Sequence, residues 1–478
     1  MNMAGRGLGG AVVIGGSMAG LLAARVLADH FEKVILVERD LRAEGPVPRK
    51  GLPQGVHLHV LLDTGRRILD QSFPGLFEQL QEQGAELIDS SRDVAWHHFG
   101  VWKKRYTSGI PLLLCTRTLL EWNVLRRVKE RPNVEFREGC SVEGLLADER
   151  GGRVTGIRVK TAQGDESWEA DLVVDASGRG SRMPQWLEAL GHARPEEEQV
   201  QVDLAYTSGL YAPPPRFHRE WKALMQYPRP PSTWRAGFIS SVEGGRWLVT
   251  LNGYFGDHAP TEPEGFLEFA RSLSRPDLYD YLRDARPLGP LSTHKVKDTR
   301  WRHYERLARF PEGLVVLGDA ACAFNPLFGQ GMSVAGLGAE LLDTCLREQA
   351  HRGDLTGLAQ HFRRRLPEVI RLPWFMSTSM DLQYPQATGE RAPGLGALHW
   401  YIRQLMERSS TDAGVHRRFN RVLHLQTGLG AVLHPFVALP VLTHGARSLV
   451  LPLQRLANTE TRPPPPEPMS PSPSPRDE

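Results

Sequence analysis

The chain has 478 residues, of which 41% are hydrophobic and 24% charged, and its formal net charge is +3. This composition is that of a globular protein, and the length is enough for two or three domains. The small charge and the scattered arginines give no reason to expect nucleic acid as a partner. The four cysteines form no CxxC pair, so we expect reduced thiols, a cytoplasmic location and no bound metal.

The first predicted unit is a strand, a glycine turn and a helix. The apolar residues 11–14 lead into Gly15, Ser17 and Gly20, and a second apolar run ends at Glu38. The glycines allow a tight turn and a close approach of the helix to the sheet, so the helix N-terminus faces a phosphate group. An acid at the end of the second strand is placed to bind ribose hydroxyls. The segment therefore predicts a dinucleotide-binding unit, with a serine where the middle glycine is usual.

The middle of the chain changes between helical and strand-like patterns. Residues 117–130 have apolar side chains at helical spacing, and residues 153–160 alternate and are expected to pair with a strand near Trp168. Residues 171–175 predict another buried strand, which runs into a Gly/Ser-rich turn. An antiparallel sheet is expected from the alternating stretches 96–106, 204–211, 238–241 and 247–254.

A second segment suited to a nucleotide lies far along the chain. The apolar run 315–317 ends in Gly318 and Asp319, and a Gly-rich turn from Pro326 to Met332 leads into a helix. The carboxylate is placed to bind a sugar-like hydroxyl, and the free N–H groups of the helix can bind an electron-rich group. Two distant segments, each suited to one half of a dinucleotide, suggest FAD as the cofactor.

The C-terminal part, residues 351–462, is expected to be mainly helical. Within it, residues 425–456 are apolar but interrupted by prolines. Two interpretations stay open: helices that pack on the cofactor domain, or a surface that contacts a membrane or a lipophilic substrate. No apolar run has the roughly 18 residues of a transmembrane helix, so none is expected. Residues 463–478 have the composition of a disordered tail.

In this order, the segments 11–38, 171–182 and 315–333 resemble the single-component flavoprotein monooxygenases of the para-hydroxybenzoate hydroxylase type. The resemblance covers most of residues 11–350. A narrower likeness points to bacterial epoxidases of polyketide and polyprenyl olefins and, more distantly, to squalene epoxidase. It is carried by residues 49–54 with His57 and His59, 115–117 with 120–122, and 175–181, where Asp175-Ala176 replaces the usual Asp-Gly.

The resemblance implies an α/β fold: a Rossmann-type FAD-binding domain, an inserted antiparallel-sheet substrate domain and a helical C-terminal region. The FAD-binding domain would be discontinuous and take residues 1–83, 113–183 and 300–350. The substrate domain would take residues 84–112 and 184–299, and its sheet would cover the flavin. The helical region and the tail would follow at 351–462 and 463–478.

The resemblance also implies roles for single residues. Arg117 would reach the phosphate or ribityl region of FAD, the turn from Pro326 would offer backbone N–H groups to the reduced flavin, and His57 would lie near it. Arg39, next to Glu38, is a candidate to stack on the adenine. The expected cofactor-binding residues are Gly15, Ser17, Gly20, Glu38, Arg39, Arg49, Arg117, Asp319, Gly331 and Met332, and the candidates for the reaction pocket are His57, Pro326 and Gly329.

The activity implied is monooxygenation, in which the cofactor carries the chemistry. NADH or NADPH would reduce FAD, reduced FAD would take up O₂, and the C4a-hydroperoxyflavin would epoxidise or hydroxylate a lipophilic secondary metabolite. Three alternative functions are compatible with such a fold: a flavin-dependent reductase of prenyl double bonds, a flavin halogenase, and a non-catalytic FAD-binding scaffold. The halogenase interpretation lacks its usual W-x-W-x-I-P segment. The substrate, the pyridine nucleotide and the oligomeric state stay open.

The predicted sheet is rich in large apolar side chains, which suggests a pocket for a bulky apolar molecule. Strand alternation would send about half of them towards the flavin. The alternative is that they only fill the core beneath the sheet. The residues concerned are Trp96, Phe99, Trp102, Tyr206, Tyr211, Phe238, Trp247 and Tyr254.

Overall fold

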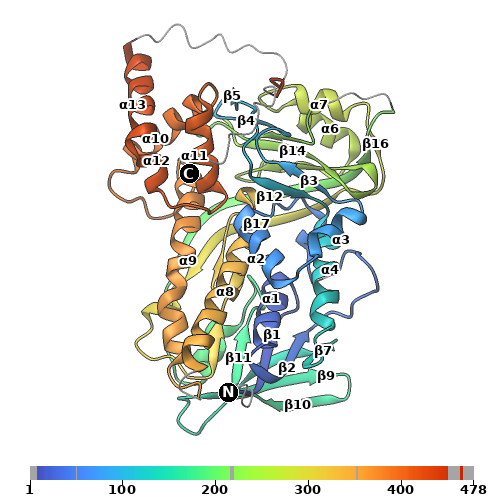
Figure 1. The fold of residues 1–478 in the computed structure, drawn as a ribbon, viewed down its shortest axis with the longest axis vertical. Helices are drawn as coiled ribbons and strands as arrows, with labels where there is room; N and C mark the ends of the chain where they lie inside the picture. Colours follow the sequence, from blue (N-terminus) through green and yellow to red (C-terminus); the bar gives the residue numbers. More distant parts are fainter. Residues whose placement is uncertain (1–7, 50, 216–219, 351–353, 451–462, 467–478) are drawn as a thin grey trace, which may run out of the picture.

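The computed structural model describes residues 8–49, 51–215, 220–350, 354–450 and 463–466. Two large sheets and a set of C-terminal helices make up the molecule (Figure 1). One sheet lies at the end of the molecule near the described N-terminus, and the other lies at the opposite end beside the C-terminal helices. The mixed α/β architecture expected from the sequence is confirmed.

The first sheet is parallel throughout and has five strands in the order β18-β11-β1-β2-β7. Its three central strands are the apolar runs recognised in the sequence, because a strand buried on both faces needs a continuous apolar run. The strands are β1 (Leu8–Ile14), β2 (Phe31–Glu38), β7 (Val134–Glu138), β11 (Leu172–Asp175) and β18 (Leu314–Val316).

Helices cover this parallel sheet and enclose the largest core cluster. The predicted helix at 117–130 is observed as α4 (Arg117–Lys129), which begins at a Thr116 cap whose hydroxyl accepts the Leu119 N–H. The other helices near it are α1 (Met18–Leu27), α2 (Asp63–Ser72), α3 (Leu76–Glu82), α5 (Met183–Ala189) and α8 (Gly331–Ala350).

Two small antiparallel sheets complete the strands outside the two large sheets, and the second of them packs against two strands of the larger sheet described next. As expected, β9 (Val154–Thr161) pairs with β10 (Gly164–Glu169), and β8 (Ser141–Ala147) completes this three-stranded sheet. The other pair is β3 (Glu86–Asp89) with β6 (Pro111–Leu114).

The second large sheet has nine strands in the order β19-β17-β12-β15-β14-β13-β4-β5, with β16 paired to β12. All four predicted strands lie in it, but β13 and β4 run parallel, so the sheet is mixed rather than antiparallel. The strands are β4 (Val94–His98), β5 (Val101–Trp102), β12 (Glu197–Ala212), β13 (Ala223–Gln226), β14 (Arg235–Val242), β15 (Arg246–Gly253), β16 (Arg286–Pro287), β17 (Ser292–Arg302) and β19 (Cys322–Ala323).

The two faces of this sheet bury different partners. On one face, Tyr211, Trp102 and Trp247 pack with α6 (Pro263–Arg271) and α7 (Asp277–Leu282). On the other face, Tyr206 and Phe238 pack with Leu327, Leu382 and Tyr384. The large aromatic side chains are therefore divided between the two faces of the sheet, as strand alternation requires.

The C-terminal helices are α9 (Leu358–Asp381), α10 (Leu395–Arg408), α11 (Ala413–Leu423), α12 (Gly430–Leu433) and α13 (Pro435–Val450). None of the helices in the described part of the chain combines the length and apolar character needed to cross a membrane. Of the predicted disordered tail, only residues 463–466 are described, and there the Arg105 guanidinium donates to the Pro464 carbonyl at 2.9 Å. Residues 451–462 and 467–478 lie outside the described residues.

His57 and His59 lie between two helical segments. A short 3₁₀ turn, η1 (Pro53–Val56), ends before His57, whose backbone is extended, and α2 begins only at Asp63. Pro53 favours this short turn because its fixed φ suits the start of a helix.

Candidate functional site

A groove of about 550 Å³ runs between the parallel sheet and the nine-stranded sheet. Its walls come from the glycine turn after β1, the segment around Asp319, the start of α8, and β12 and β17 of the larger sheet. Twelve of the residues singled out in the sequence line it, namely Gly15, Ser17, Glu38, Arg39, Arg49, His57, Arg117, Asp319, Pro326, Gly329, Gly331 and Met332.

The remaining predicted residue, Gly20, lies behind the groove and shapes it. A Cβ on Gly20 would lie 1.7 Å from the Gly15 carbonyl oxygen, so only glycine lets α1 approach the turn. Gly15 itself has φ +101°, and a Cβ there would lie 2.6 Å from the Ala176 carbonyl oxygen. The turn is thus a backbone-walled cradle at the N-terminus of α1, which is the geometry of a phosphate site.

Charged side chains are paired with one another at this end of the groove. Glu38 accepts a hydrogen bond from the Gly16 N–H at 3.2 Å and from Arg49 at 2.5 Å. Arg49 also donates to Glu121 at 2.6 Å, which joins the end of β2 to α4. Arg42 lies 3.6 Å from Glu38, and Arg39 is exposed at the rim. Glu38 therefore has protein partners where ribose hydroxyls were expected.

Glu121 is the centre of this cluster, and it was not among the predicted site residues. Its carboxylate accepts hydrogen bonds from Arg117 at 3.0 Å and from the Ser17 hydroxyl at 3.0 Å. Burial opposes ionisation of Glu121, but the guanidinium groups of Arg117 and Arg49 outweigh it, so the pKa of Glu121 lies below its ordinary value. The sequence held one signal for this pair, since Arg117 and Glu121 stand at the i, i+4 spacing of a helix ion pair.

Asp319 lies in a 3₁₀ turn, η4 (Gly318–Ala320), directly after β18. Within the described residues no hydrogen bond reaches its carboxylate, which lines the groove. Burial raises the pKa of Asp319, and Arg179 and Arg117 act against that rise. Asp319 is therefore free to accept a hydrogen bond from a ligand hydroxyl.

The turn between β19 and α8 is held from behind by a buried polar group. In the turn η5 (Pro326–Phe328), the Asn325 side chain accepts the Leu327 N–H at 3.0 Å. The Asn325 amide donates to Asp381 at 2.9 Å, and the Tyr254 hydroxyl donates to Asp381 at 3.2 Å. Burial raises the pKa of Asp381 to about 7. The end of α9 thus supports the turn that carries Pro326 and Gly329.

His57 and His59 lie together at the sheet side of the groove. His57 is buried, its Nδ1 lies 2.7 Å from the Ser208 hydroxyl, and burial lowers its pKa to about 3. His59 Nδ1 lies 2.9 Å from the His57 carbonyl oxygen, and burial lowers the pKa of His59 to about 4. Both imidazoles are therefore neutral near pH 7 and suited to hydrogen bonding rather than to carrying charge.

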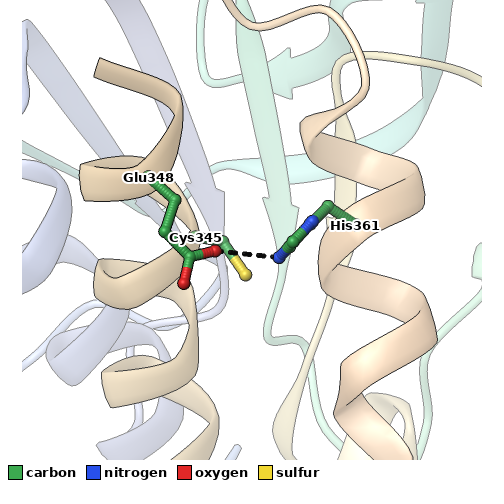
Figure 2. Close-up of side chains that lie close together, drawn as sticks. All are labelled: Cys345, Glu348 and His361. Carbon is green, nitrogen blue, oxygen red and sulfur yellow. Dashed lines mark ion pairs between the residues drawn. The ribbon is translucent and has the colours of Figure 1, made fainter. Parts of the chain in front are cut away.

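Away from the groove, Cys345 and Glu348 on α8 lie near His361 on α9, with ligand atoms within 4.8 Å of one another (Figure 2). The His361 ring lies 2.9 Å from Glu348, and the Arg365 guanidinium lies 3.1 Å from Glu348 and 3.2 Å from His361. Burial raises the pKa of the Cys345 thiol to about 11. A fixed guanidinium among the three groups disfavours a dication, so we interpret the cluster as an ion pair that joins two helices.

Sequence comparison agrees with the nucleotide geometry. Residues 11–185 match the family described as FAD dependent oxidoreductase. Protein Rv3254 of Mycobacterium tuberculosis (strain ATCC 25618 / H37Rv) is 34% identical over 399 residues, which cover 80% of this chain and 82% of that protein. The chain belongs to the FAD-dependent oxidoreductase family.

Two further similarities concern monooxygenases. Kynurenine 3-monooxygenase of Salinispora arenicola (strain CNS-205) is 27% identical over 383 residues, covering 75% of this chain and 76% of that protein. The crystal structure of p-nitrophenol 4-monooxygenase PnpA from Pseudomonas putida DLL-E4 superposes with a TM-score of 0.61 at 19% identity, covering 89% of this chain and all of that one. At this identity the superposition shows a shared fold.

The family fits the groove. The glycine cradle, the unpartnered carboxylate of Asp319 and the first N–H groups of α8 are the donors and acceptors that a flavin dinucleotide needs. Several lining residues were not among the predicted site residues, among them Arg179, His294 and Gln330. Arg179 and Gln330 lie within segments that the sequence analysis singled out, 175–181 and the turn from Pro326 to Met332, whereas no motif marks His294, which only the fold brings to the groove.

Proposed function

We propose that the protein is an FAD-dependent monooxygenase that uses NADH or NADPH and O₂ to epoxidise or hydroxylate a lipophilic secondary metabolite. The observation that carries the proposal is the groove itself, which joins the glycine cradle to Asp319 and α8 and then reaches the face of the nine-stranded sheet. A cofactor bound along it would have its far end against that sheet. The similarity to kynurenine 3-monooxygenase supports the same reaction type.

In this proposal the N-terminus of α1, with Gly15 and Ser17 before it, holds the diphosphate. Arg49 and Arg117 exchange contacts with Glu121 for contacts with phosphate oxygens, and Glu38 binds the ribose. Asp319 accepts a hydrogen bond from a hydroxyl on the other half of FAD, and Arg39 covers the adenine. Gly331 and Met332 present backbone N–H groups at the start of α8, where the helix dipole favours negative charge.

When bound, FAD would supply the redox chemistry, namely uptake of hydride and activation of O₂. The residues of the chain bind, orient and exclude water. Pro326 and Gly329 form the turn at the end of the groove, and Asn325 fixes this turn through Asp381. A rigid turn keeps a substrate carbon at a fixed distance from the cofactor, which is the main structural requirement of such catalysis.

The decisive experiment is turnover with isotopically labelled dioxygen. The FAD-loaded protein, NADPH or NADH and a panel of lipophilic olefins and prenylated phenols are incubated under ¹⁸O₂, and the products are analysed by mass spectrometry. One labelled oxygen atom per product supports the proposal. A product changed by two hydrogens without label would instead establish the prenyl reductase, and tight FAD binding with no turnover of any kind would favour the scaffold.

We also propose that α12 and α13 contact a membrane. Leu433, Phe436, Leu439 and Leu442 are 61%, 72%, 61% and 45% exposed. The Arg418 guanidinium of α11 lies 5.8 Å from the centre of the Phe436 ring, and within the described residues no ion pair joins it to a carboxylate. An apolar stripe beside an unpaired cation suits the interface of an anionic bilayer.

Phe436→Glu should abolish flotation with phosphatidylglycerol vesicles, whereas Leu288→Glu, at a similarly apolar exposed site elsewhere, should not.

A further inference from the structure

The sheet wall of the groove carries polar side chains where an apolar pocket was expected. Tyr206 on β12 stands opposite Asn252 on β15 and opposite His294 on β17. Ser208, two residues further along β12, stands opposite Thr250. Because alternate residues share a face, these five side chains and the His57 ring that lies on Ser208 form one surface. We call this surface the polar wall: His57, Tyr206, Ser208, Thr250, Asn252 and His294.

A chain of hydrogen bonds orders part of the polar wall. The Leu58 N–H donates to the Thr250 hydroxyl at 3.3 Å, the Thr250 and Ser208 hydroxyls lie 2.7 Å apart, and Ser208 lies 2.7 Å from His57 Nδ1. Both hydroxyl protons are used only if Thr250 donates to Ser208 and Ser208 donates to Nδ1. In that arrangement the proton of the neutral imidazole is on Nε2.

Three side chains of the polar wall carry polar atoms without a hydrogen-bond partner among the described residues. The atoms are His57 Nε2, the Tyr206 hydroxyl and both amide atoms of Asn252. These side chains are buried, being 3%, 7% and 0% exposed. The Leu327 N–H lies near enough to act on the Tyr206 hydroxyl, but its hydrogen bond goes to Asn325 at 3.0 Å. Of the three side chains, His57 and Tyr206 line the groove, whereas Asn252 is fully buried and does not line it. Because a buried polar group without a partner is costly, a molecule bound in the groove would gain by pairing with His57 and Tyr206.

The charge state of the wall narrows the choice of partner. Burial lowers the pKa of His57 and raises that of Tyr206, so both stay neutral near pH 7. A neutral imidazole N–H and a phenol O–H are donors for an uncharged acceptor. The phenol oxygen of Tyr206 can in turn accept a hydrogen bond from a hydroxyl on the same molecule.

We propose that the polar wall binds an oxygen-bearing end of the substrate, a carbonyl, phenol or alcohol group. The substrate is then an amphiphile, with one oxygenated end on the polar wall and an apolar body against neighbouring residues such as Leu58 and Val296. The inference rests on the proposed function, since it names the class of molecule that the groove takes besides FAD. The expected substrate is therefore not a pure hydrocarbon but a lipophilic molecule with a hydrogen-bonding group at one end.

The test measures binding rather than turnover. The FAD-loaded protein is titrated with two matched pairs, 2-naphthol against naphthalene and farnesol against farnesene, and the perturbation of the flavin absorption spectrum gives Kd. The oxygenated member of at least one pair should bind about tenfold more tightly. Tyr206→Phe should remove most of that preference and leave the hydrocarbon affinity unchanged.

The matched control is Tyr211→Phe, on the same strand but on the opposite face, which should keep the preference. FAD content and reduction potential are measured for each variant. Equal binding within both pairs, or no binding of any probe, overturns the inference. So does a Tyr206→Phe variant that shifts FAD affinity or potential but keeps the preference, because the wall would then face the flavin.

The binding assay needs neither NAD(P)H nor O₂, so the two proposals fail separately. A Tyr206-dependent preference without incorporation of labelled oxygen would support substrate binding at the polar wall and overturn the monooxygenase proposal. Incorporation of labelled oxygen without the preference would support the monooxygenase and overturn the role of the polar wall.

Discussion

Two buried carboxyl groups stand behind the two ends of the groove, and their surroundings are opposite. Glu121 lies behind the glycine turn among two guanidinium groups, and its pKa is lowered. Asp381 lies behind the Pro326 turn, where its hydrogen-bond partners among the described residues are the Asn325 amide and the Tyr254 hydroxyl, and its pKa is raised to about 7. The same functional group is therefore held charged at one end and close to neutrality at the other.

The difference matches the two halves of the proposed ligand. A diphosphate brings negative charge, and the end that would receive it holds arginine side chains. Without the ligand, these guanidinium groups are paired with Glu121 and Glu38. A ring system and a lipophilic substrate bring little charge, and the end that receives them is built from neutral donors. A charged end and a nearly neutral end let one groove orient a dinucleotide without a contact to every atom.

Replacement of Glu121 by Gln should give the largest effect. It leaves the buried Arg117 without its carboxylate and Arg49 with Glu38 alone, and breaking a buried pair costs about 3–5 kcal/mol. Urea unfolding of the FAD-free protein measures the loss. Since the pKa of Glu121 is lowered, its contribution is present above pH 4.5 and is lost as the pH falls through the folded-state value.

The effect should be smaller in the FAD-loaded protein, because the diphosphate of the proposed complex supplies negative charge to the same guanidinium groups. Glu135→Gln, which removes a half-exposed surface pair with Lys33, is the control and should cost about 1 kcal/mol or less. A loss equal to that of the control would mean that Glu121 is not the centre of the cluster.

Asp381→Asn should give a pH-dependent difference of the opposite sign. The pKa of Asp381 in the folded protein, about 7, exceeds its ordinary value of 3.8, so the folded state keeps a proton that the unfolded chain has released. Its contribution to stability is complete below pH 3.8 and is lost as the pH rises to about 7. The wild-type protein should therefore lose stability relative to Asp381→Asn over this range, by about 4 kcal/mol at most.

Unfolding midpoints of both proteins at pH 4 and pH 8 measure this difference, and effects common to both cancel. His303, paired with Glu305 and Glu198, is a group whose pKa is raised by hydrogen bonds to carboxylates despite its burial, and it is unchanged in the variant. A difference that does not vary with pH would show that the Asp381 carboxyl is ionised throughout, and would remove the contrast with Glu121.

The contrast between Glu121 and Asp381 could not be predicted from the sequence. The strands, the glycine turn and Asp319 carry local signals, because a buried parallel strand is a continuous apolar run and a phosphate turn needs glycine. Arg49, Glu121 and Ser17 meet only when the chain folds, and Asp381 lies 56 residues after Asn325 on another helix. Tyr206 was recognised as a strand aromatic, but its polar neighbours across the sheet depend on register, which the sequence does not specify.

Asp319→Ala tests a third carboxylate of the groove, whose surroundings differ from those of both Glu121 and Asp381. Asp319 has no hydrogen-bond partner among the described residues, while Arg179 and Arg117 act on it from a distance. Loss of a charge-assisted hydrogen bond to a cofactor hydroxyl should weaken FAD binding by about 1.5–3 kcal/mol, or roughly tenfold to more than a hundredfold. Fluorescence titration of FAD-free protein measures Kd, and Asp319→Asn should lose less because it keeps an acceptor. Unchanged Kd in both variants would exclude Asp319 from the cofactor site.

Ser17→Ala should give the smallest effect. It tests whether the Ser17 hydroxyl serves only the Glu121 cluster or also binds the cofactor. The Ser17 hydroxyl donates to Glu121 at 3.0 Å, but Glu121 keeps both guanidinium partners when that bond is lost, and Ser17 is partly exposed. The free energy of unfolding should therefore fall by about 1 kcal/mol. FAD affinity should stay within a few fold, because the backbone N–H groups of the turn, not the hydroxyl, face the proposed diphosphate. The matched control is Ser177→Ala, because the Ser177 hydroxyl donates to Asp175 and to no other group among the described residues, and the FAD affinity of this variant should also be unchanged. A large loss of FAD affinity in Ser17→Ala alone would mean that the hydroxyl leaves Glu121 to bind the phosphate directly, and that serine at this position contributes to recognition.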